Sequence, residues 1–517
     1  MQVVACGESI YMETADRISR RSLVGGLVAA PLLAASPSKR ANLASSPPNL
    51  LFIVLDDMND WIGSLKGHPQ ASTPNMDALA KRGTNFTNAH CQAPLCNPSR
   101  ASFLTGLRPS TTGIYGLSPS HRSVPALRDH VTMPEHFTNN GYTTIGLGKV
   151  YHMLEGQHRS REFQIWREPK FGPSPPKRLG GGDFGGTLVD WGIFPEKDED
   201  LEDYKLADAA IEQLRMLPHD KPFLLAVGFS CPHVPCYAPA KWFDRIPLNE
   251  VVLPKIKHGD RRDTPEFSWY LHWKLPEPRL AYYEKLGELP ARVRAYLAVT
   301  SYIDAQIGRV LNALEETGRM QNTIVVLIGD NGYHFGEKEI TGKNSLWDRA
   351  THVPLIMAGP GIPKRSISDP AELLDIYPTL VELAKLPART GLEGRSLVPQ
   401  MHGQKRTAPA ITTANQGNHG IRTDRWRYIR YADGSEELYD MRADPNEWTN
   451  LANDPEYRQR KEELTRWLPK IDVPHAPGSA MRILTRSADG GWLWEGTPII
   501  PGQIPMEPYL GVFPPSK

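Results

Sequence analysis

The stretch CNPSRASFLTG begins with Cys96 and places Pro98 two residues later and Arg100 four residues later. Proline presets the first turn of a helix, so we expect a helix that starts near Pro98 and ends at Gly106. Cys96 then lies just ahead of a helix N-terminus, where free N–H groups and the helix dipole favour negative charge. A thiolate there has a lowered pKa, which makes Cys96 a candidate nucleophile. The alternative is a small buried cysteine with a surface arginine nearby.

Carboxylates form the second group of residues suited to chemistry. Asp56 and Asp57 follow the apolar run NLLFIVL, and Asp330 and Asn331 follow the apolar run NTIVVLIG. Taken singly, each aspartate is more typical of a turn or a helix cap. Because two strand ends repeat the pattern, the sequence favours an all-oxygen site for a hard divalent cation, Ca²⁺ or Mg²⁺.

Two further apolar runs end in basic side chains. The run KPFLLAVGF leads into SCPHVP, which carries His233, and the run GYTTIGLG leads into Lys149 and His152. A lone histidine or lysine is usually structural or solvated. In open α/β sheets, however, ligands bind at the carboxyl ends of the strands, so we expect these four ends to converge on one site.

The segments between these runs are typical of helices that cover a parallel sheet. STPNMDALAKRG has Thr73 as N-cap, Pro74 at the first helical position and Gly83 at its end. A longer helix is expected over residues 291–317 and another over residues 199–217. Strands and helices alternate, which predicts an α/β fold with a large, mostly parallel central sheet flanked by helices.

Composition excludes several classes of protein. The 517 residues include 59 Lys and Arg against 58 Asp and Glu, so no broad basic face is expected and nucleic acid is not an expected partner. The five cysteines are too few and too scattered for a disulfide scaffold, and their spacing matches no zinc site. Beyond the N-terminal region, no segment is apolar enough to predict stable membrane insertion.

The N-terminal segment SRRSLVGGLVAAPLLAAS combines the pair Arg20 and Arg21 with a short apolar run and small residues. The run is shorter than the roughly 20 residues that a bilayer requires, so it favours an export signal over a membrane span. The paired arginines indicate the twin-arginine route, and a disordered basic tail is the alternative. We expect residues 1–45 to form a signal and linker, and the protein to be periplasmic or secreted.

Taken whole, CNPSRASFLTG matches the C-x-P-S-R-x-x-x-L-T-G signature of the type I sulfatases without a departure. The resemblance continues in GLGKVYH, PHVP, IGDNGYHFGE and LLDIYPTLVELAKLP and covers roughly residues 49–468. Among sulfatases, GLGKVYH and PHVP are most similar to the iduronate-2-sulfatase branch. The chain is therefore identified as a member of this family, which lies in the alkaline-phosphatase-like superfamily.

The resemblance implies that Cys96 does not act as a thiol. A separate maturation enzyme oxidises the equivalent cysteine to formylglycine, and the hydrated aldehyde is the nucleophile. The resemblance also implies that Asp56, Asp57, Asp330 and Asn331 hold a Ca²⁺ ion together with the modified Cys96, with Mg²⁺ as the alternative cation.

The remaining site residues follow from the same resemblance. Arg100 is expected to hold the diol or its alkoxide, and Lys149, His152 and Lys343 are expected to donate to the sulfate oxygens. His233 is the expected general acid for the departing sugar oxygen, with Lys343 as the competing candidate. His152 is the expected base when sulfate is expelled.

The expected fold is the alkaline-phosphatase/sulfatase-like sandwich, with a catalytic domain over residues 46–400. Residues 401–517 are expected to form a smaller C-terminal α+β subdomain with an antiparallel sheet, a helix over residues 455–468 and a tail from residue 473 that wraps the surface or is partly disordered. The loops 169–192 and 264–278 carry aromatic and cationic side chains, which suit a sugar-binding cleft and suit packing equally well.

The expected activity is hydrolysis of the sulfate ester of a sulfated saccharide, such as a 2-O-sulfated iduronate. One alternative is a phosphonate or phosphate ester hydrolase on the same scaffold. The other is a non-catalytic protein that binds sulfated glycans and keeps Cys96 as a thiol.

Overall fold

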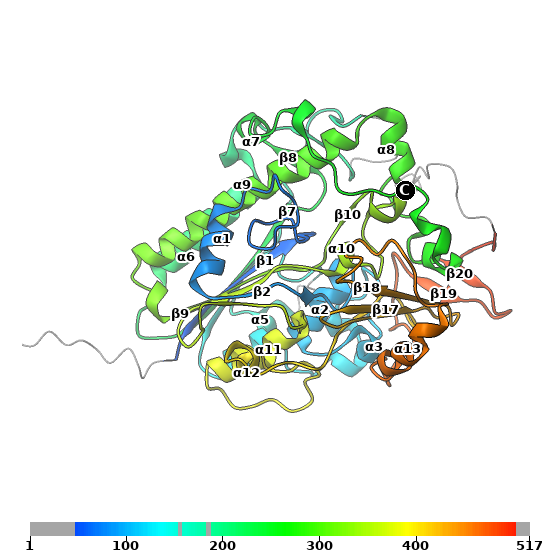
Figure 1. The fold of residues 1–517 in the computed structure, drawn as a ribbon. Coiled ribbons are helices and arrows are strands. Elements are labelled where there is room, and N and C mark those ends of the chain that lie inside the picture. The colour runs from blue at the N-terminus through cyan, green and yellow to red at the C-terminus, as the bar shows by residue number, and fades with distance from the viewer. Residues whose placement is uncertain (1–46, 154–157, 182–187, 503–517) are drawn as a thin grey trace, which may run out of the picture. The chain divides into compact units, whose positions relative to one another are not determined.

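An eight-stranded sheet forms the framework of the protein, in the order β13-β2-β12-β9-β1-β7-β4-β5 (Figure 1). The computed structural model describes residues 47–153, 158–181 and 188–502, so the expected export signal and linker lie outside the described residues. The four strands predicted from the sequence are neighbours in this sheet, and all three pairs that they form are parallel. They are β9 (Thr323–Gly329), β1 (Asn49–Asp56), β7 (Phe223–Pro232) and β4 (Thr143–Gly148).

Shorter strands extend the sheet at both edges. β5 (Ile165–Arg167) pairs in parallel with β4. On the other side, β12 (Leu355–Ala358) is antiparallel to both β9 and β2 (Thr84–Phe86), and β13 (Arg365–Ile367) is parallel to β2. The prediction of a large, mostly parallel sheet is therefore confirmed.

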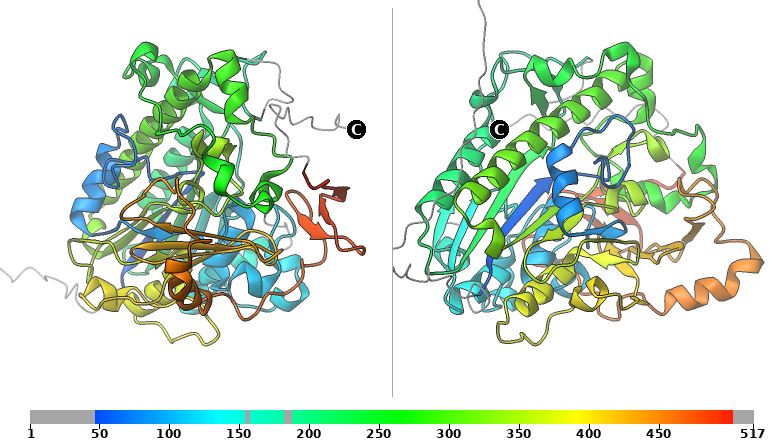
Figure 2. Two further views of the ribbon diagram at one scale, coloured as in Figure 1. Left: turned by 45° about the vertical axis from the view of Figure 1, so that its right-hand side comes forward. Right: turned by 60° about the vertical axis from the view of Figure 1, so that its left-hand side comes forward.

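Helices cover both faces of the sheet, which is why β1 is buried along its whole length. One face packs against α1 (Pro74–Arg82), α6 (Glu202–Met216) and α9 (Leu289–Glu316). The other face packs against α2 (Cys96–Thr105), α4 (Met133–Asn139) and α11 (Ile376–Leu383). Figure 2 shows α6 and α9 running along one face. Successive side chains of β1 enter opposite cores, Leu51, Ile53 and Leu55 on one face and Leu50, Phe52 and Val54 on the other.

The helix expected after Pro98 begins two residues earlier than predicted. α2 starts at Cys96 itself and ends at Gly106, whose φ of 75° is left-handed, as expected for a glycine at a helix end. α1 begins at Pro74 as predicted, but Thr73 makes no side-chain cap to its helix. Instead, the Thr73 hydroxyl accepts a hydrogen bond from Gly63 N over 2.9 Å and donates to Asp77 over 3.2 Å.

A four-stranded antiparallel sheet follows in the C-terminal part, as predicted. It consists of β15 (Ala410–Thr413), β16 (His419–Arg422), β17 (Trp426–Arg430) and β18 (Glu436–Asp440), and α13 (Arg458–Thr465) follows. Thr413 N of β15 donates a hydrogen bond to Gln92 O over 2.8 Å. This sheet therefore contacts the segment that leads to Cys96. The division at residue 400 stays a prediction.

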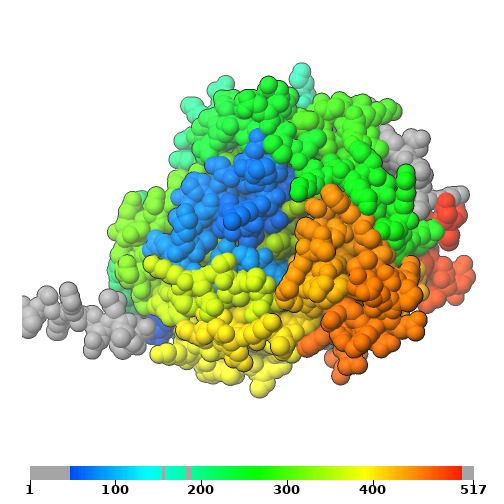
Figure 3. All heavy atoms as spheres, in the orientation of Figure 1, coloured from blue at the N-terminus to red at the C-terminus, as the bar shows by residue number. Residues whose placement is uncertain are grey.

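The tail is folded where the structure describes it, so the alternative of partial disorder does not apply to residues 473–502, and the alternative of a surface-wrapping tail stays a prediction. This segment forms a small antiparallel sheet of β19 (Leu484–Arg486), β20 (Trp492–Trp494) and β21 (Thr497–Pro498). Leu484 and Trp494 are buried in one cluster with Phe267 and Tyr270. Figure 3 shows the green segment that includes the loop 264–278 against the orange segment that includes α13 (Figure 1), which precedes the tail. The loop 264–278 therefore serves packing.

Across the described residues, no helix is long and apolar enough to cross a bilayer.

Candidate active site

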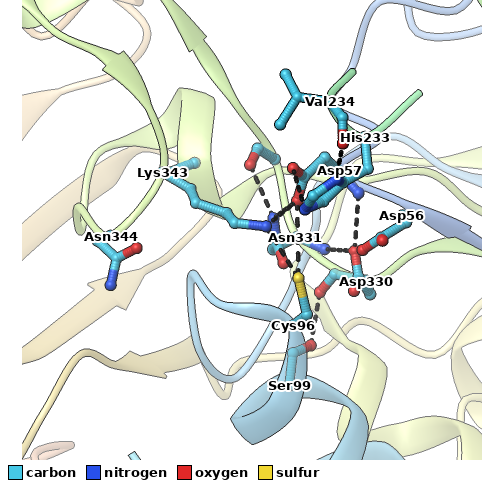
Figure 4. Close-up of polar contacts among 12 residues, drawn as sticks. Asp56, Asp57, Cys96, Ser99, His233, Val234, Asp330, Asn331, Lys343 and Asn344 are labelled. Carbon is cyan, nitrogen blue, oxygen red and sulfur yellow. Dashed lines mark hydrogen bonds and ion pairs between the residues drawn. The ribbon is translucent and has the colours of Figure 1, made fainter. Parts of the chain in front are cut away.

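The predicted site residues meet at the carboxyl ends of the four central strands (Figure 4). β1 ends at Asp56, β9 leads into Asp330, β4 leads into Lys149 and β7 leads toward His233. α2 presents Cys96 from its first turn, and Lys343 follows the short strand β11 (Thr341–Gly342). The strand-end rule thus brought together side chains that are up to 274 positions apart in the chain.

Three carboxylates form the centre of the site. Asp56, Asp57 and Asp330 are fully buried, and one oxygen from each lies within 4.8 Å of the other two. Burial, opposed by Arg100 but reinforced by the other two carboxylates, raises the pKa of Asp330 to about 7. A cluster of three buried carboxylates is costly without a nearby positive charge.

The unpartnered oxygens around this cluster fit a hard cation. The Asn331 amide nitrogen donates to Asp57 Oδ1 over 2.7 Å and to Gly332 O over 3.0 Å, which leaves Asn331 Oδ1 buried without a hydrogen-bond partner. Asp57 Oδ2 is likewise buried without one. Buried polar atoms normally have partners, so these two oxygens are suited to ligate a cation. The donor set of three carboxylates and one amide oxygen suits Ca²⁺ or Mg²⁺.

Arg100 holds two of these carboxylates in place. Its Nε donates to Asp330 Oδ2 over 2.8 Å and its Nη2 lies 3.3 Å from Asp56 Oδ1. Its Nη1 donates to the carbonyls of Lys149 and Val150. Within the described part of the chain, the hydrogen bonds of Arg100 go to these groups and not to Cys96. Its expected contact with the diol remains a prediction, while its contacts here fix Asp56 and Asp330.

Two lysines face the same carboxylates. Lys149 Nζ donates to Asp56 Oδ2, and Lys343 Nζ donates to Asp57 Oδ1 and to Cys96 Sγ, the latter over 2.9 Å. Burial favours a neutral amine, but Asp57, Cys96, Asp56 and Asp330 outweigh it and raise the pKa of Lys343 well above its usual value. The pKa of Lys149 is raised against burial chiefly by Asp56. Both side chains therefore carry positive charge.

Cys96 is buried at the first position of α2, with its Sγ 3.9 Å from Asp57 Oδ1. Burial, reinforced by Asp56, raises the pKa of the Cys96 thiol far above its ordinary value, although Lys343 and Lys149 act in the opposite direction. The prediction of a lowered pKa is therefore wrong, because desolvation outweighs the helix N-terminus. A thiolate nucleophile is disfavoured at this position.

The two histidines differ in their surroundings. His233 Nδ1 lies 2.5 Å from Val234 O, which identifies it as the protonated nitrogen, and Nε2 lies 3.7 Å from Asp57 Oδ2. Burial lowers the pKa of His233, although Asp57 and Asp56 oppose it. Burial and then Lys149 lower the pKa of His152 to about 3, so its imidazole is neutral. Its Nδ1 is buried without a hydrogen-bond partner.

A cavity of about 440 Å³ opens onto these side chains. Its lining includes Cys96, Lys149, His152, His233 and Lys343. The loop 169–192 contributes residues 170–174 and 188, as one of its two interpretations expected, whereas the loop 264–278 contributes none of the lining residues.

Asp203 and Arg482 are among the lining residues that were not predicted from the sequence. Asp203 at the start of α6 accepts hydrogen bonds from the main-chain N–H groups of Ser230 and Cys231, over 3.0 and 2.8 Å, and so fixes the chain just before His233. Arg482 reaches the cavity from the tail. No motif marks either residue. An acidic side chain in the first turn of a helix, as at Asp203, is common for its interaction with the helix dipole and does not by itself indicate a site.

Comparison with known protein families agrees with this geometry. The family model described as Sulfatase matches residues 48–386. The chain belongs to the sulfatase family. A second model, described as N-sulphoglucosamine sulphohydrolase, C-terminal, matches residues 336–473 of this sulfatase. The fold predicted from the resemblance, that of the alkaline-phosphatase-like superfamily, is confirmed.

Individual relatives of this sulfatase match over most of their length. A protein of Formosa agariphila named Sulfatase is 42% identical over 446 residues, which are 82% of this chain and 87% of the relative. Human Iduronate 2-sulfatase is 30% identical over 498 residues, 87% of this chain and 86% of the relative. A solved structure described as a 2-O GAG sulfatase superposes with a TM-score of 0.64 at 25% identity and covers 82% of this chain and 91% of that chain. The protein is a sulfuric ester hydrolase.

Proposed function

We propose that this sulfatase removes sulfate from a sulfated saccharide by means of formylglycine at position 96 and a bound Ca²⁺ ion, with Mg²⁺ as the alternative. One observation carries the proposal. Cys96, the first residue of the signature, lies buried beside both Lys343 and the Asp57 carboxylate of the all-oxygen set. Its raised thiol pKa argues against direct use of the thiol and is compatible with a modified residue.

Two groups complete the site when they are present. The cation, held by Asp56, Asp57, Asp330 and Asn331, supplies positive charge for the sulfate oxygens. The hydrated formylglycine supplies a hydroxyl nucleophile and requires a separate maturation enzyme as a partner.

The residues of this chain perform the remaining tasks. The ammonium groups of Lys149 and Lys343 bind and orient the sulfate oxygens, where charge-assisted hydrogen bonds are strongest. Arg100 keeps Asp56 and Asp330 in position. His152 lines the cavity as a neutral imidazole that accepts a proton only at low pH or transiently.

His233 is proposed to give a proton to the departing sugar oxygen. Its Nδ1–H is engaged by Val234 O, so Nε2 carries the transferable proton in the imidazolium form, which burial disfavours. Asp57 Oδ2 at 3.7 Å stabilises the protonated form. The alkoxide of a sugar is a poor leaving group, and for this reason a positioned acid contributes strongly.

A 2-O-sulfated uronic acid, such as iduronate, is the proposed substrate. The names of two relatives support this choice, Iduronate 2-sulfatase at 30% identity and a 2-O GAG sulfatase at 25% identity. The cavity volume of about 440 Å³ is within the range of about 300–1,000 Å³ common for small-molecule sites.

Release of sulfate from a panel of saccharides tests the proposal. The panel holds 2-O-sulfated iduronate, 6-O-sulfated glucosamine, an aryl phosphate and phenyl phosphonate, with the Cys96→Ala variant as control. Preferred release from the 2-O-sulfated uronate by the wild-type enzyme supports the proposal. Preferred hydrolysis of the 6-O-sulfated sugar contradicts the substrate, and preferred hydrolysis of the phosphorus esters contradicts the reaction.

We also propose that residues 1–45 direct export, through the twin-arginine route, to the periplasm or the medium. The support is the pair Arg20 and Arg21 ahead of a short apolar run. Replacement of both arginines by lysine is expected to retain the protein in the cytoplasm of its host. Unchanged export of this variant, measured by cell fractionation, contradicts the proposed route.

A further inference from the structure

Arg482 brings a positive charge to the catalytic cavity from a part of the chain that lies outside both family matches, which end at residues 386 and 473. Its side chain is about one-tenth exposed and lines the same cavity as Cys96 and Lys343. The tail thus contributes to the site of this sulfatase.

The guanidinium of Arg482 lies beside the loop that carries Lys343. Its Nη1 donates to Asn344 Oδ1 over 2.9 Å, and Asn344 directly follows Lys343. Its Nη2 lies 3.2 Å from Glu277 Oε1. Arginine has five N–H donors in a rigid fork, so these two bonds fix the side chain and leave donors for a ligand.

The main chain at Arg482 is built to an unusual conformation. Met481 and Arg482 have φ values of 61° and 64°, in the left-handed region that residues with a side chain rarely adopt. Arg482 N donates to Glu495 Oε1 over 2.5 Å, and Arg482 O accepts from Asn415 Nδ2 over 3.2 Å. Strained backbone held by surrounding contacts is concentrated at functional sites.

We propose that Arg482 binds a second anionic group of the saccharide, either a carboxylate or a sulfate ester that is not hydrolysed. The inference rests on the proposed function and adds a specificity-determining residue to it. Lys149 and Lys343 are paired with aspartates around the scissile sulfate. Arg482, which is paired with Glu277, lines the same cavity from a separate segment. Its planar fork matches the oxygens of either anion.

Three methyl glycosides serve as matched probes. One is 2-O-sulfated iduronic acid, the second is its carboxyl-reduced form, 2-O-sulfated idose, and the third is 2,6-di-O-sulfated idose. They differ only in the substituent at one carbon, which is a carboxylate, an alcohol or a sulfate ester. The probe that is favoured over the alcohol identifies the anion that Arg482 binds.

The test variant is the double substitution Arg482→Gln with Glu277→Gln, because removal of the arginine alone leaves a buried, unpaired Glu277. Glu277→Gln alone controls for the second change. Arg486→Gln removes an exposed arginine from β19 of the same small sheet and leaves the cavity lining intact.

We expect the wild-type enzyme to favour one anionic probe over the alcohol by about tenfold to a hundredfold in kcat/KM, because a hydrogen bond to a charged group typically contributes this much. The double variant should lose that ratio and the Arg486→Gln protein should keep it. The Glu277→Gln protein retains the guanidinium without one of its anchors, so it should lose less of the ratio than the double variant. The inference is overturned if the double variant has an unchanged ratio, or if the wild-type enzyme has no preference for either anionic probe.

Calorimetric binding of the same three probes to the Cys96→Ala protein, with and without the Arg482 and Glu277 substitutions, separates this inference from the proposed function. If the wild-type enzyme hydrolyses none of the probes, the proposed substrate is wrong. The binding measurements then still decide the role of Arg482. Tighter binding of an anionic probe that depends on Arg482 supports the inference, and equal binding by both proteins overturns it.

Discussion

Lys343 Nζ lies 2.9 Å from Cys96 Sγ and donates a second hydrogen bond to Asp57 Oδ1. One ammonium group therefore contacts both the residue proposed to become the nucleophile and a carboxylate of the proposed cation site. This double contact explains why the loop after β11 belongs to the active site, although no central strand ends there. Lys343 thus contacts the position of the proposed nucleophile, whereas His233 is the proposed acid for the departing sugar oxygen.

Substitution of Lys343 by methionine should lower kcat about 100-fold to 1,000-fold, because it removes a charge-assisted contact at the reacting centre. The loss should be similar for an aryl sulfate and for a saccharide sulfate, since Lys343 contacts the nucleophile position. Steady-state kinetics with both substrates measure it. A loss confined to the saccharide would instead identify Lys343 as the general acid.

Substitution of His233 by alanine should lower kcat on a saccharide sulfate by about 100-fold to 10,000-fold, the usual contribution of a general acid. The loss should be much smaller on 4-nitrophenyl sulfate, whose leaving group needs no proton. The comparison of the two substrates within one variant is the readout. Equal losses on both would remove His233 from the role of acid.

Substitution of Asn331 by leucine should weaken cation binding, because it removes the buried oxygen that has no other partner. At a free ion concentration of about 100 to 1,000 times the dissociation constant, a bound ion stabilises a fold by about 3–4 kcal/mol. EDTA should therefore lower the Tm of the wild-type protein more than that of the variant. Metal analysis and thermal melts measure both effects. The control is Asn322→Leu, just before the opposite end of β9. Stoichiometric calcium in the Asn331→Leu protein would contradict the assigned ligand set.

Glu162 should make stability depend on acid pH. It is fully buried, but hydrogen bonds and charge from His121 and Arg122, aided by Thr132, outweigh burial and lower its pKa to about 2. Because the folded pKa lies below the unfolded value, the stabilisation is present above pH about 4.5 and is lost as the pH falls toward about 2.

The free energy of unfolding of the Glu162→Gln variant should accordingly be about 3 kcal/mol lower than that of the wild-type protein at pH 7. This difference should shrink as the pH falls from about 4.5 to about 2. Denaturant unfolding at a series of pH values measures it. Glu212→Gln, an exposed change on α6, serves as the control. A difference that stays constant across this range would refute the pKa assignment.

The sequence predicted the framework of the site for a simple physical reason. Apolar runs such as NLLFIVL are buried on both faces of a parallel sheet, so the polar residues that follow them must meet at one edge. Asp56, Asp330, Lys149 and His233 were all found by this rule, and the structure brings them together.

Residues outside the strand ends were not predictable in this way. Lys343 was identified only through the family resemblance, and Arg482 not at all, because both come from loops whose paths depend on tertiary contacts. The pKa of Cys96 was predicted in the wrong direction for a related reason. Position at a helix start can be read from the sequence, whereas the depth of burial that raises the pKa depends on how α2 packs against the sheet.

Mass spectrometry of the peptide that contains Cys96, taken from protein produced in its native host, tests the central claim most directly. The peptide is expected to have the mass of formylglycine, in which an aldehyde has replaced the CH₂–SH group of the side chain. An unmodified thiol in protein that fully hydrolyses a sulfated saccharide would contradict it.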